Sequence, residues 1–316
     1  MKIVLLDAAT LGTGLDLARL SSLGEVAVYD NTLPAEAAER IHDADVVIIN
    51  KFKITKELVN ASPALKLVCI FATGYDNIDV EACKKKNVAV CNVKGYSTHS
   101  VAQLTVLLAL ALLNRLSEYA DFVNDGRYGK SGVANYLEPV YHELYGKTWG
   151  IVGAGAIGSQ VAKVAEAFGC KVLAFKRTPT DEFECVSLER LLKESDVISL
   201  HTPLNDGTRG LIGKDELSAM KKDAILINAA RGAVTDEAAV ANAILSGEIG
   251  GFATDVYSTE PFPAEHPFNK LLRMRNVILT PHMAWSAIEA RSRCLDEIIL
   301  NIEAFLKGEK RNRVDI

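Results

Sequence analysis

Short apolar runs alternate with longer mixed segments along the whole chain. The runs are rich in β-branched residues, and such strands separated by helical segments are typical of parallel sheets covered on both faces. They form two series. The first comprises "KIVLLD", "VAVYD", "DVVIIN", "LKLVCIF" and "VAVCNV", and the second "TWGIVG", "KVLAF", "DVISLH", "AILINA", "GFATDV" and "NVILTP". The pattern therefore predicts an α/β protein with two open, doubly wound parallel sheets.

Three segments lie outside this alternation. Residues 100–116 are expected to form one long helix that joins the two series. Residues 124–147, "NDGRYGKSGVANYLEPVYHELYGK", are too many for an ordinary loop, so they are either functional or an arm that packs on another subunit. The chain closes with "SAIEARSRCLDEIILNIEAFLKGEK", an amphipathic helix that can return to the first domain.

Length and charge narrow the classes of protein. A chain of 316 residues suggests two domains, and a hydrophobic fraction of 49% is enough for substantial cores. The net charge of -5 argues against nucleic acid as a partner. The opening "MKIVLLDA" lacks a signal-peptide pattern, and the longest apolar stretch, residues 101–113, is too short to span a bilayer. We expect a cytoplasmic protein with no membrane partner.

The six cysteines indicate neither a disulfide framework nor a metal site. None belongs to a C-x-x-C pair, and several lie in apolar runs. We expect reduced cysteines in the core of a cytosolic protein and no bound metal.

A glycine-rich turn carries the first chemical signal. Gly153, Gly155 and Gly158 in "GIVGAGAIGSQ" follow an apolar strand and open a helix expected over residues 157–168. In a dinucleotide-binding fingerprint the first glycine permits the turn, the second admits the pyrophosphate, and the third lets helix and strand pack. The helix start at Ala156 and Ile157 would present N–H groups to that anion. A glycine-rich turn without a ligand is the alternative.

The end of the next strand bears on the choice of cofactor. The fingerprint usually has an acidic residue about 20 residues further on, which binds the ribose diol of NAD. Here the strand over residues 171–175 is followed by Lys176, Arg177 and Thr178. Two cations and a hydroxyl suit a 2′-phosphate, so the sequence predicts NADP(H) in preference to NAD(H). The alternative is a solvated strand end in an enzyme that uses NAD.

Polar residues follow three other strands of the second series. Arg231, Glu260 and His282, together with Asp255, fall just past strand ends, where ligands bind in open parallel sheets. Arginine can grip a carboxylate and a carbonyl oxygen, and histidine can donate a proton near neutral pH. A carboxylate beside the histidine would stabilise the imidazolium. Each residue alone could be structural, but together they indicate hydride transfer to a 2-oxo acid.

Over nearly its whole length the sequence resembles the D-isomer-specific 2-hydroxyacid dehydrogenases. The matching phrases are "FATGYDNIDVEAC", "NVKGYSTHSVAQLT", "GKTWGIVGAGAIGS", "LHTPLNDGTRGLI", "INAARGAVTDEAAV", "ATDVYSTEP" and "TPHMAWSAIEAR". The resemblance implies a Rossmann-type cofactor domain, residues 98–286, inserted into a flavodoxin-like substrate domain, residues 1–97 and 287–316. It also implies a homodimer built largely by the cofactor domains and the arm.

The resemblance also assigns roles to residues. Arg231 would be the substrate clamp, His282 the acid/base and Glu260 its partner. The backbone of Thr73 and Gly74 would meet the substrate carboxylate. Asp255 would contact the cofactor. So would Thr202 in "LHTPLNDGTRGLI" and three residues in "INAARGAVTDEAAV", which are Ala229, Ala230 and Arg231.

Departures from the family pattern bear on the substrate. Lys94 and Ala72 replace a common proline and serine, and Glu260 is not the glutamine of formate dehydrogenases. Trp285 and Arg291 resemble the glycerate dehydrogenase/hydroxypyruvate reductase branch, in which a bulky indole would narrow the pocket; alternatively Trp285 plugs the domain hinge. The expected substrates are hydroxypyruvate and glyoxylate. The alternatives are a D-lactate-type or larger-chain dehydrogenase and a non-enzymatic NAD(P)H-sensing protein of the corepressor type.

Overall fold

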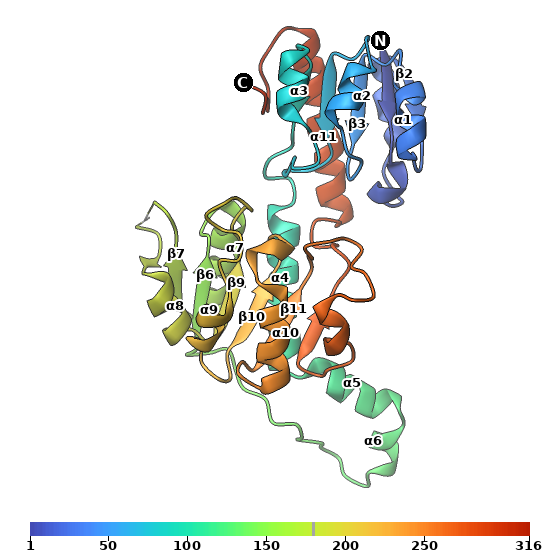
Figure 1. Ribbon diagram of the computed structural model, residues 1–316. Coiled ribbons are helices and arrows are strands. Elements are labelled where there is room, and N and C mark those ends of the chain that lie inside the picture. The colour runs from blue at the N-terminus through green and yellow to red at the C-terminus, as the bar shows by residue number, and fades with distance from the viewer. Residues whose placement is uncertain (179–180) are drawn as a thin grey trace. The chain divides into compact units, whose positions relative to one another are not determined.

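The computed structural model describes residues 1–178 and 181–316 and divides into two compact units. Unit 1 comprises residues 1–97 and 285–316, and unit 2 comprises residues 98–284. Each unit contains one sheet, and every strand pairing recorded in the two sheets is parallel (Figure 1). The expectation of two parallel sheets in an α/β fold is confirmed.

Unit 1 has a five-stranded sheet in the order β2-β1-β3-β4-β5. This is the flavodoxin-like order, in which the strand order reverses between β1 and β3. All residues of β3, β4 and β5 are buried, as expected for strands covered on both faces. The strands are β1 (Lys2–Leu5), β2 (Glu25–Val28), β3 (Val46–Ile49), β4 (Leu67–Ile70) and β5 (Ala89–Cys91).

The last helix of the chain belongs to unit 1. Helix α11 (Ile288–Leu306) buries Ala290, Leu295 and Ile298 in the same core as the strands β1, β3, β4 and β5. The other helical segments of this unit are η1 (Ala8–Leu11), η2 (Leu17–Ser22), α1 (Pro34–Arg40), α2 (Lys56–Asn60) and α3 (Val80–Lys85). The chain therefore leaves unit 1 after residue 97 and returns to it at residue 285.

Unit 2 has a seven-stranded sheet in the order β12-β11-β10-β9-β6-β7-β8. Counted from β6, this is the Rossmann order of two mononucleotide-binding halves with one strand added at the end. The strands are β6 (Thr148–Val152), β7 (Lys171–Phe175), β8 (Glu184–Cys185), β9 (Val197–Leu200), β10 (Ile225–Asn228), β11 (Gly251–Thr254) and β12 (Val277–Leu279). The strand order reverses at β6 and β9, so a ligand crevice is expected beyond the carboxyl ends of these two strands.

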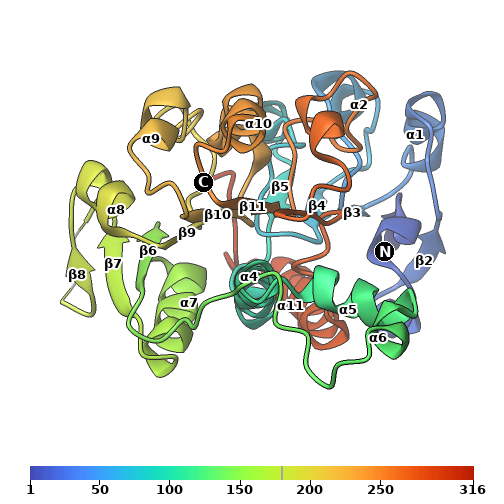
Figure 2. The same ribbon diagram turned by 90° about the horizontal axis from the view of Figure 1, so that it is seen from below.

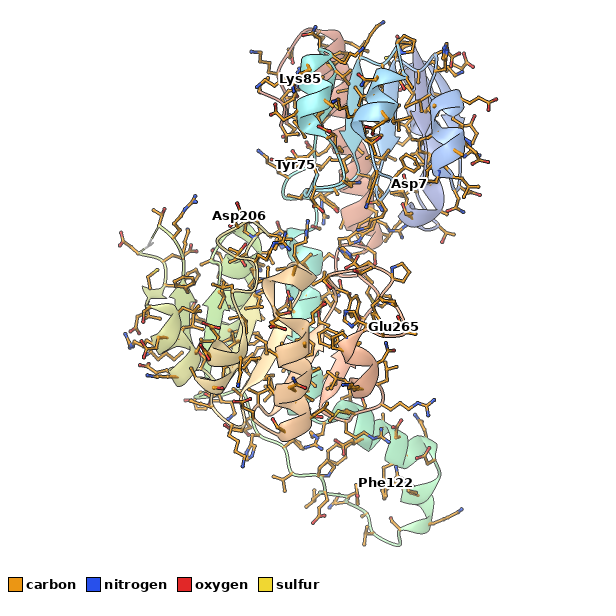
Figure 3. The ribbon with its side chains drawn as sticks, in the orientation of Figure 1. Asp7, Tyr75, Lys85, Phe122, Asp206 and Glu265 are labelled. Atoms are coloured by element: carbon orange, nitrogen blue, oxygen red, sulfur yellow. The ribbon has the colours of Figure 1, made fainter. Side chains whose placement is uncertain are left out.

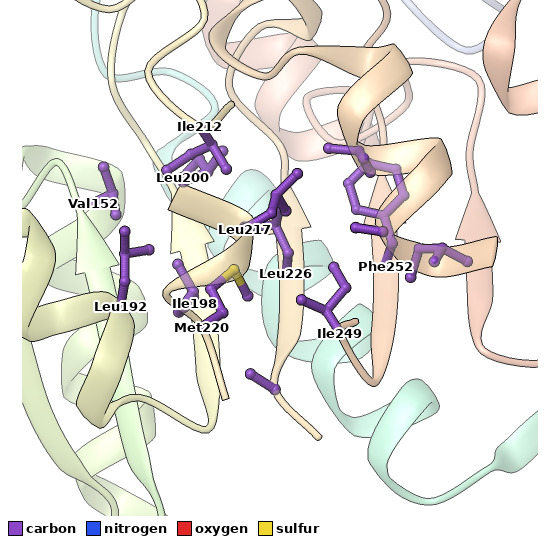
Figure 4. Packing of buried hydrophobic residues seen from close by; sticks show 14 of the residues in the cluster. Val152, Leu192, Ile198, Leu200, Ile212, Leu217, Met220, Leu226, Ile249 and Phe252 are labelled. Atoms are coloured by element: carbon purple, nitrogen blue, oxygen red, sulfur yellow. The ribbon is translucent and has the colours of Figure 1, made fainter. Parts of the chain in front are cut away.

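Helices lie on both faces of this sheet. Figure 2 shows α9 and α10 on one face, and α7 and α4 on the other. The face that carries α9 and α10 covers a core that includes Ile198, Leu226 and Phe252 (Figure 4). The helical segments are α4 (Thr98–Leu113), α5 (Leu116–Asn124), α6 (Arg127–Lys130), α7 (Ala156–Ala167), α8 (Leu188–Glu194), α9 (Lys214–Ser218), η3 (Gly232–Val234), α10 (Glu237–Ser246) and η4 (Pro267–Leu271).

The helix expected over residues 100–116 is broken. Helix α4 ends at Leu113, and α5 starts at Leu116 with a bend of 66° between the two. Arg115 lies between them with a left-handed φ of 52°, and its guanidinium pairs with Glu118 in the first turn of α5. A residue with positive φ cannot continue an α-helix, which explains the break.

Residues 116–145 form an arm that projects from the sheet of unit 2 (Figure 1). Phe122, labelled in Figure 3, stacks on Tyr136 at 3.8 Å between ring centroids. Tyr119 contacts Tyr136 and Tyr141 edge-to-face. The arm therefore contains a small aromatic cluster, which packs α5 against residues 131–145, a segment without regular secondary structure.

Among the described residues, no single helix has the length and apolar character needed to cross a bilayer, while the bent pair α4–α5 meets that criterion on length and composition alone. The six cysteines are free thiols, and five of them are buried.

Candidate active site

The glycine loop joins β6 to α7 and leaves open space at one point. A Cβ on Gly153 would lie 2.9 Å from the backbone of His201, and one on Gly158 would lie 2.3 Å from the carbonyl oxygen of Gly153. A Cβ on Gly155 would meet no described atom within 4 Å. Gly153 and Gly158 therefore let strand and helix pack, whereas Gly155, an exposed residue at the start of α7, leaves room for a ligand.

Two buried polar groups lie beside this loop, at the end of β9. The Nδ1 atom of His201 and the hydroxyl of Thr202 have no hydrogen-bond partner among the described residues. Burial lowers the pKa of His201 to about 3, so the ring is neutral. Its Nε2 atom lies 2.9 Å from the hydroxyl oxygen of Ser199, which also accepts a hydrogen bond from the Trp149 indole. Because Nε2 of His201 faces the Ser199 hydroxyl as an acceptor, the ring proton is assigned to Nδ1. The Nδ1–H of His201 and the hydroxyl of Thr202 are then available to a bound molecule.

The basic pair follows β7, the neighbour of β6. Lys176, Arg177 and Thr178 are exposed, and within the described ranges their side chains have no recorded ion pair or hydrogen bond. Glu182, an acidic residue a few positions further on, pairs with Lys163 of α7 at 2.9 Å. The carboxyl ends of β6 and β7 meet at one edge of the sheet, so the basic pair and the glycine loop lie at the same edge.

Arg231 lies on the loop that follows β10. The buried side chain of Asn228 shapes this loop, because it donates to the carbonyl of Arg231 (2.9 Å) and accepts from the N–H of Ala230 (3.1 Å). The half-buried guanidinium donates to the carbonyl of Ala230 at 2.8 Å. Within the described part of the chain no carboxylate pairs with it, so it can receive an anionic ligand.

The structure brings Glu260 and His282 together. The Nδ1 atom of His282 lies 2.6 Å from Oε2 of Glu260, across 22 positions of the chain. The other oxygen of Glu260 accepts the N–H of Tyr257 at 3.0 Å. Both side chains are partly exposed, 23% for His282 and 29% for Glu260. An imidazole oriented by a carboxylate is an arrangement suited to acid/base chemistry.

Asp255 anchors the turn that carries His282. Its carboxylate is fully buried and accepts hydrogen bonds from the hydroxyl of Thr280 (2.7 Å) and the N–H groups of Met283 (2.9 Å) and Ala284 (2.8 Å). His282 itself has a left-handed φ of 53°. This anchoring role was not foreseen from the sequence, and contact of Asp255 with a cofactor stays a prediction.

The remaining predicted residues lie in unit 1. The hydroxyl of Thr73 donates to Val93 at 2.7 Å, and Asn92 donates to the carbonyl of Thr73 at 2.7 Å. These contacts hold the loop after β4. Trp285 packs edge-to-face on Tyr96 with 6.4 Å between centroids, and it contacts the core of unit 1.

Sequence reasoning missed His201 and Asn228. Both are polar residues at the carboxyl ends of mainly apolar strands: Asn228 is the last residue of β10, and His201 directly follows β9. A polar residue in that place is a signal that could have identified them, because ligands bind beyond such strand ends.

Comparison with known proteins identifies the family. The family model for the NAD-binding domain of D-isomer-specific 2-hydroxyacid dehydrogenases matches residues 106–284. The chain belongs to this family, and it is an oxidoreductase that uses a nicotinamide cofactor and a small 2-hydroxy or 2-oxo acid.

Curated relatives match along the chain. A hydroxypyruvate reductase from Blautia hydrogenotrophica is 37% identical over 324 residues, covering 100% of this chain and 100% of the relative. A glycerate dehydrogenase from Methylorubrum extorquens is 38% identical, covering 99% of each chain. A glyoxylate reductase from Thermococcus litoralis is 40% identical, covering 86% of this chain and 83% of the relative. The expected placement in the glycerate/glyoxylate branch of the family is confirmed.

Solved structures also match. The acyclic imino acid reductase Bsp5 in complex with NADPH and D-Arg has a TM-score of 0.88 and 30% identity, covering 99% of this chain and 100% of that one. D-Lactate dehydrogenase from Aquifex aeolicus, complexed with NAD and lactic acid, has a TM-score of 0.86 and 31% identity, covering 100% and 99%.

Proposed function

We propose that the protein uses NADPH to reduce hydroxypyruvate to D-glycerate and glyoxylate to glycolate. The observation that carries the proposal is the 2.6 Å contact between His282 and Glu260, on loops that follow adjacent strands of the unit 2 sheet. The names of the relatives, hydroxypyruvate reductase, glycerate dehydrogenase and glyoxylate reductase, support this substrate class.

The chemistry divides among three side chains. A bound nicotinamide supplies the hydride to the carbonyl carbon of the substrate. Arg231 holds the carboxylate and carbonyl oxygens with its planar fork, because no carboxylate among the described residues competes for it. His282 gives a proton from Nε2 to the developing alkoxide, while Glu260 at Nδ1 orients the ring and stabilises its charged form.

The residues at the carboxyl ends of β6 and β9 fit the diphosphate part of a dinucleotide. Gly155 leaves open space before α7, and the N–H groups of Ala156 and Ile157 start that helix. The hydroxyl of Thr202 and Nδ1 of His201 are buried groups without partners among the described residues. We assign these groups, with Ala229 and Ala230, to cofactor binding.

Preference for NADP(H) rests on the basic pair. Lys176, Arg177 and Thr178 are exposed beside the glycine loop, and charge-assisted hydrogen bonds to a phosphate contribute about 1.5–3 kcal/mol each. The NADPH complex of Bsp5 supports this choice, and the NAD complex of the Aquifex enzyme supports the alternative.

Three residues of unit 1, Thr73, Gly74 and Trp285, are also assigned to substrate binding. The backbone N–H groups of Thr73 and Gly74 donate no recorded hydrogen bond within the described residues, so they can receive the substrate carboxylate. Trp285 would limit the size of the substrate side chain. A cytoplasmic location stays a prediction.

A homodimer is the proposed oligomeric state. The arm exposes apolar side chains, with Leu137 75% exposed and Val140 69% exposed. Exposed apolar clusters of this kind mark surfaces that another protein covers, and a second copy would bury them.

The test is a panel of 2-oxo acids assayed with both reduced cofactors. Hydroxypyruvate and glyoxylate should give the highest kcat/KM, above pyruvate and 2-oxoisocaproate. A maximum with pyruvate or the branched acid would favour the D-lactate-type or larger-chain alternative. Cofactor binding without turnover of any 2-oxo acid would favour the sensor alternative and contradict the proposal.

A further inference from the structure

The loop that carries Glu260 has no regular secondary structure between β11 and η4. It includes Glu265, labelled in Figure 3. Glu260 must nevertheless stay within hydrogen-bond distance of His282, so other contacts have to fix the loop. The described contacts converge on two adjacent residues, Tyr257 and Ser258, and on the peptide that joins them.

A second carboxylate holds this peptide. Oε1 of Glu237, the first residue of α10, accepts the N–H of Ser258 at 2.8 Å. Oε2 accepts the Ser258 hydroxyl and also lies 3.0 Å from Nε2 of His266. The side chains of Glu237 and His266 are only 9% and 5% exposed. Both oxygens of Glu237 are therefore engaged inside the protein.

The carboxylates of Glu260 and Glu237 accept hydrogen bonds from the N–H groups of two consecutive residues. The N–H of Tyr257 donates to Glu260 and the N–H of Ser258 donates to Glu237. The two N–H groups belong to adjacent peptide units that share the Cα atom of Tyr257, so a displacement of Ser258 that breaks the second bond is passed to the first donor through that atom. The position of Glu260 is thus coupled to the bonds of Glu237.

The other side of the peptide rests on Gly232, the residue after Arg231. A Cβ on Gly232 would lie 2.0 Å from the carbonyl carbon of Tyr257 and 2.2 Å from the nitrogen of Ser258. Only glycine permits this approach. The Tyr257 hydroxyl in turn donates to the carbonyl of Thr280 at 2.9 Å, two positions before His282. Tyr257 therefore contacts the loops of all three proposed catalytic residues, through its N–H, its hydroxyl and the peptide that joins it to Ser258.

His266 completes the arrangement. Its Nδ1 atom accepts the N–H of Phe268 at 3.3 Å, so the ring proton is assigned to Nε2, which donates to Glu237. Glutamine at position 237 cannot accept hydrogen bonds from both Ser258 and His266 as Glu237 does. Its single oxygen can face either the Ser258 N–H or His266, and its amide group then meets a donor on the other side.

We propose that Glu237 is a positioning residue for the Glu260–His282 pair and acts through the Tyr257–Ser258 peptide. The catalytic part of this inference rests on the proposed function. Glu237 itself bonds to Ser258 and His266, and so it is assigned no contact with substrate or cofactor.

The test compares Glu237→Gln with Glu216→Gln. Glu216 is a matched control, because it lies in the first turn of α9 and also accepts one backbone N–H, that of Gly213 at 3.0 Å. Hydrogen exchange is measured at the amides of Tyr257 and Ser258. In Glu237→Gln exchange should rise about tenfold or more at both amides, and in Glu216→Gln at neither. Faster exchange at Ser258 alone would overturn the coupling, and this readout needs no enzymatic activity.

The second readout is the pH profile of kcat/KM. Glu237→Gln should lower kcat about tenfold and shift the acid limb in the same direction as Glu260→Gln. In the double variant the shift should equal that of Glu260→Gln alone, because residues that act through one group are not additive. An unchanged profile or additive shifts would overturn the proposal. If wild-type protein reduces no 2-oxo acid, the proposed function fails, and the exchange experiment still decides whether Glu237 positions Glu260.

Gly232→Ala is the second variant. The added methyl group must displace the same peptide, so it should reproduce the altered profile in protein that remains folded by circular dichroism. A folded Gly232→Ala enzyme with the wild-type profile would contradict the route through this peptide.

Discussion

His282 occupies a backbone conformation that histidine rarely adopts. A left-handed φ costs a non-glycine residue about 1–3 kcal/mol, and such residues persist where the surroundings hold them. Here the surroundings are the three hydrogen bonds that Asp255 accepts from residues 280–284. The conformation of His282 is therefore maintained by the buried carboxylate of Asp255, 27 positions earlier in the chain.

His282→Ala removes the proposed proton donor. We expect kcat to fall by about 10²–10⁴-fold, the usual contribution of a positioned acid or base, while cofactor binding is retained. Steady-state kinetics and fluorescence titration with NADPH measure the two quantities. His42→Ala, at an exposed position of unit 1, is the control. Nearly full kcat in His282→Ala would exclude this role.

Arg231→Lys keeps the charge and loses the planar fork. We expect kcat/KM to fall for every 2-oxo acid tested, because a lysine cannot replace a bidentate contact. The control is Arg209→Lys, an exposed arginine of the same unit. If a single substrate were affected, Arg231 would determine selectivity, and another group would have to hold the carboxylate.

At the scale of elements, the proposed preference for NADP(H) rests on the residues that follow β7. Replacing Lys176 by Asp and Arg177 by Ser should reverse a preference for NADPH over NADH, because the acid accepts a ribose diol and repels a 2′-phosphate. In wild-type enzyme the preference should fall as salt rises, since the side chains are exposed. The ratio of kcat/KM for the two cofactors is measured, with Lys222→Asp as the control. A wild-type preference for NADH would refute the assignment.

The C-terminal tail stabilises unit 1 in a pH-dependent manner. Asp315 accepts the N–H of Val90 at 2.9 Å and pairs with Arg313. Burial opposes ionisation of Asp315, but Arg313 and the Val90 N–H outweigh it and hold the pKa below its ordinary value.

A lowered folded-state pKa stabilises the protein fully above the ordinary carboxyl pKa of about 4, and this contribution is lost progressively as the pH falls from there through the lower folded-state pKa. Asp315→Asn should therefore reduce the free energy of unfolding of unit 1 by about 1.5–3 kcal/mol at pH 7. The difference from wild type should shrink as the pH falls below about 4. Denaturant unfolding at several pH values measures it, and a difference independent of pH would contradict this account.

At the scale of the whole molecule, the proposed dimer depends on the arm. Leu137→Asp combined with Val140→Asp should convert the proposed dimer to a monomer, because charges would replace the apolar side chains that a second copy is proposed to bury. Sedimentation velocity measures the mass. Leu33→Asp is the control, since Leu33 is 65% exposed in unit 1. Wild-type protein that sediments as a monomer would contradict the dimer.

The sequence by itself determined the elements and the class of protein. Apolar runs of β-branched residues predict strands directly, and β7 spans the expected residues 171–175. The glycine spacing predicts the turn before α7, because the backbone geometry of that turn depends on local residues. The break at Arg115 was not predicted, since an arginine carries no local signal for a left-handed φ.

Only the tertiary structure decided which side chains meet. Glu260 lies beside His282, Asp255 holds the turn of His282, and Glu237 holds the loop of Glu260. These contacts join residues 21 to 28 positions apart, and each depends on the register of adjacent parallel strands and on loops that leave the same edge of the sheet. A sequence pattern of period 2 or 3.6 describes burial within one element. It contains no information on the distance between two loops. The pairing of Glu260 with His282 was expected only from the family resemblance, and the contacts that Asp255 and Glu237 make with the loops of these proposed catalytic residues follow from the fold alone.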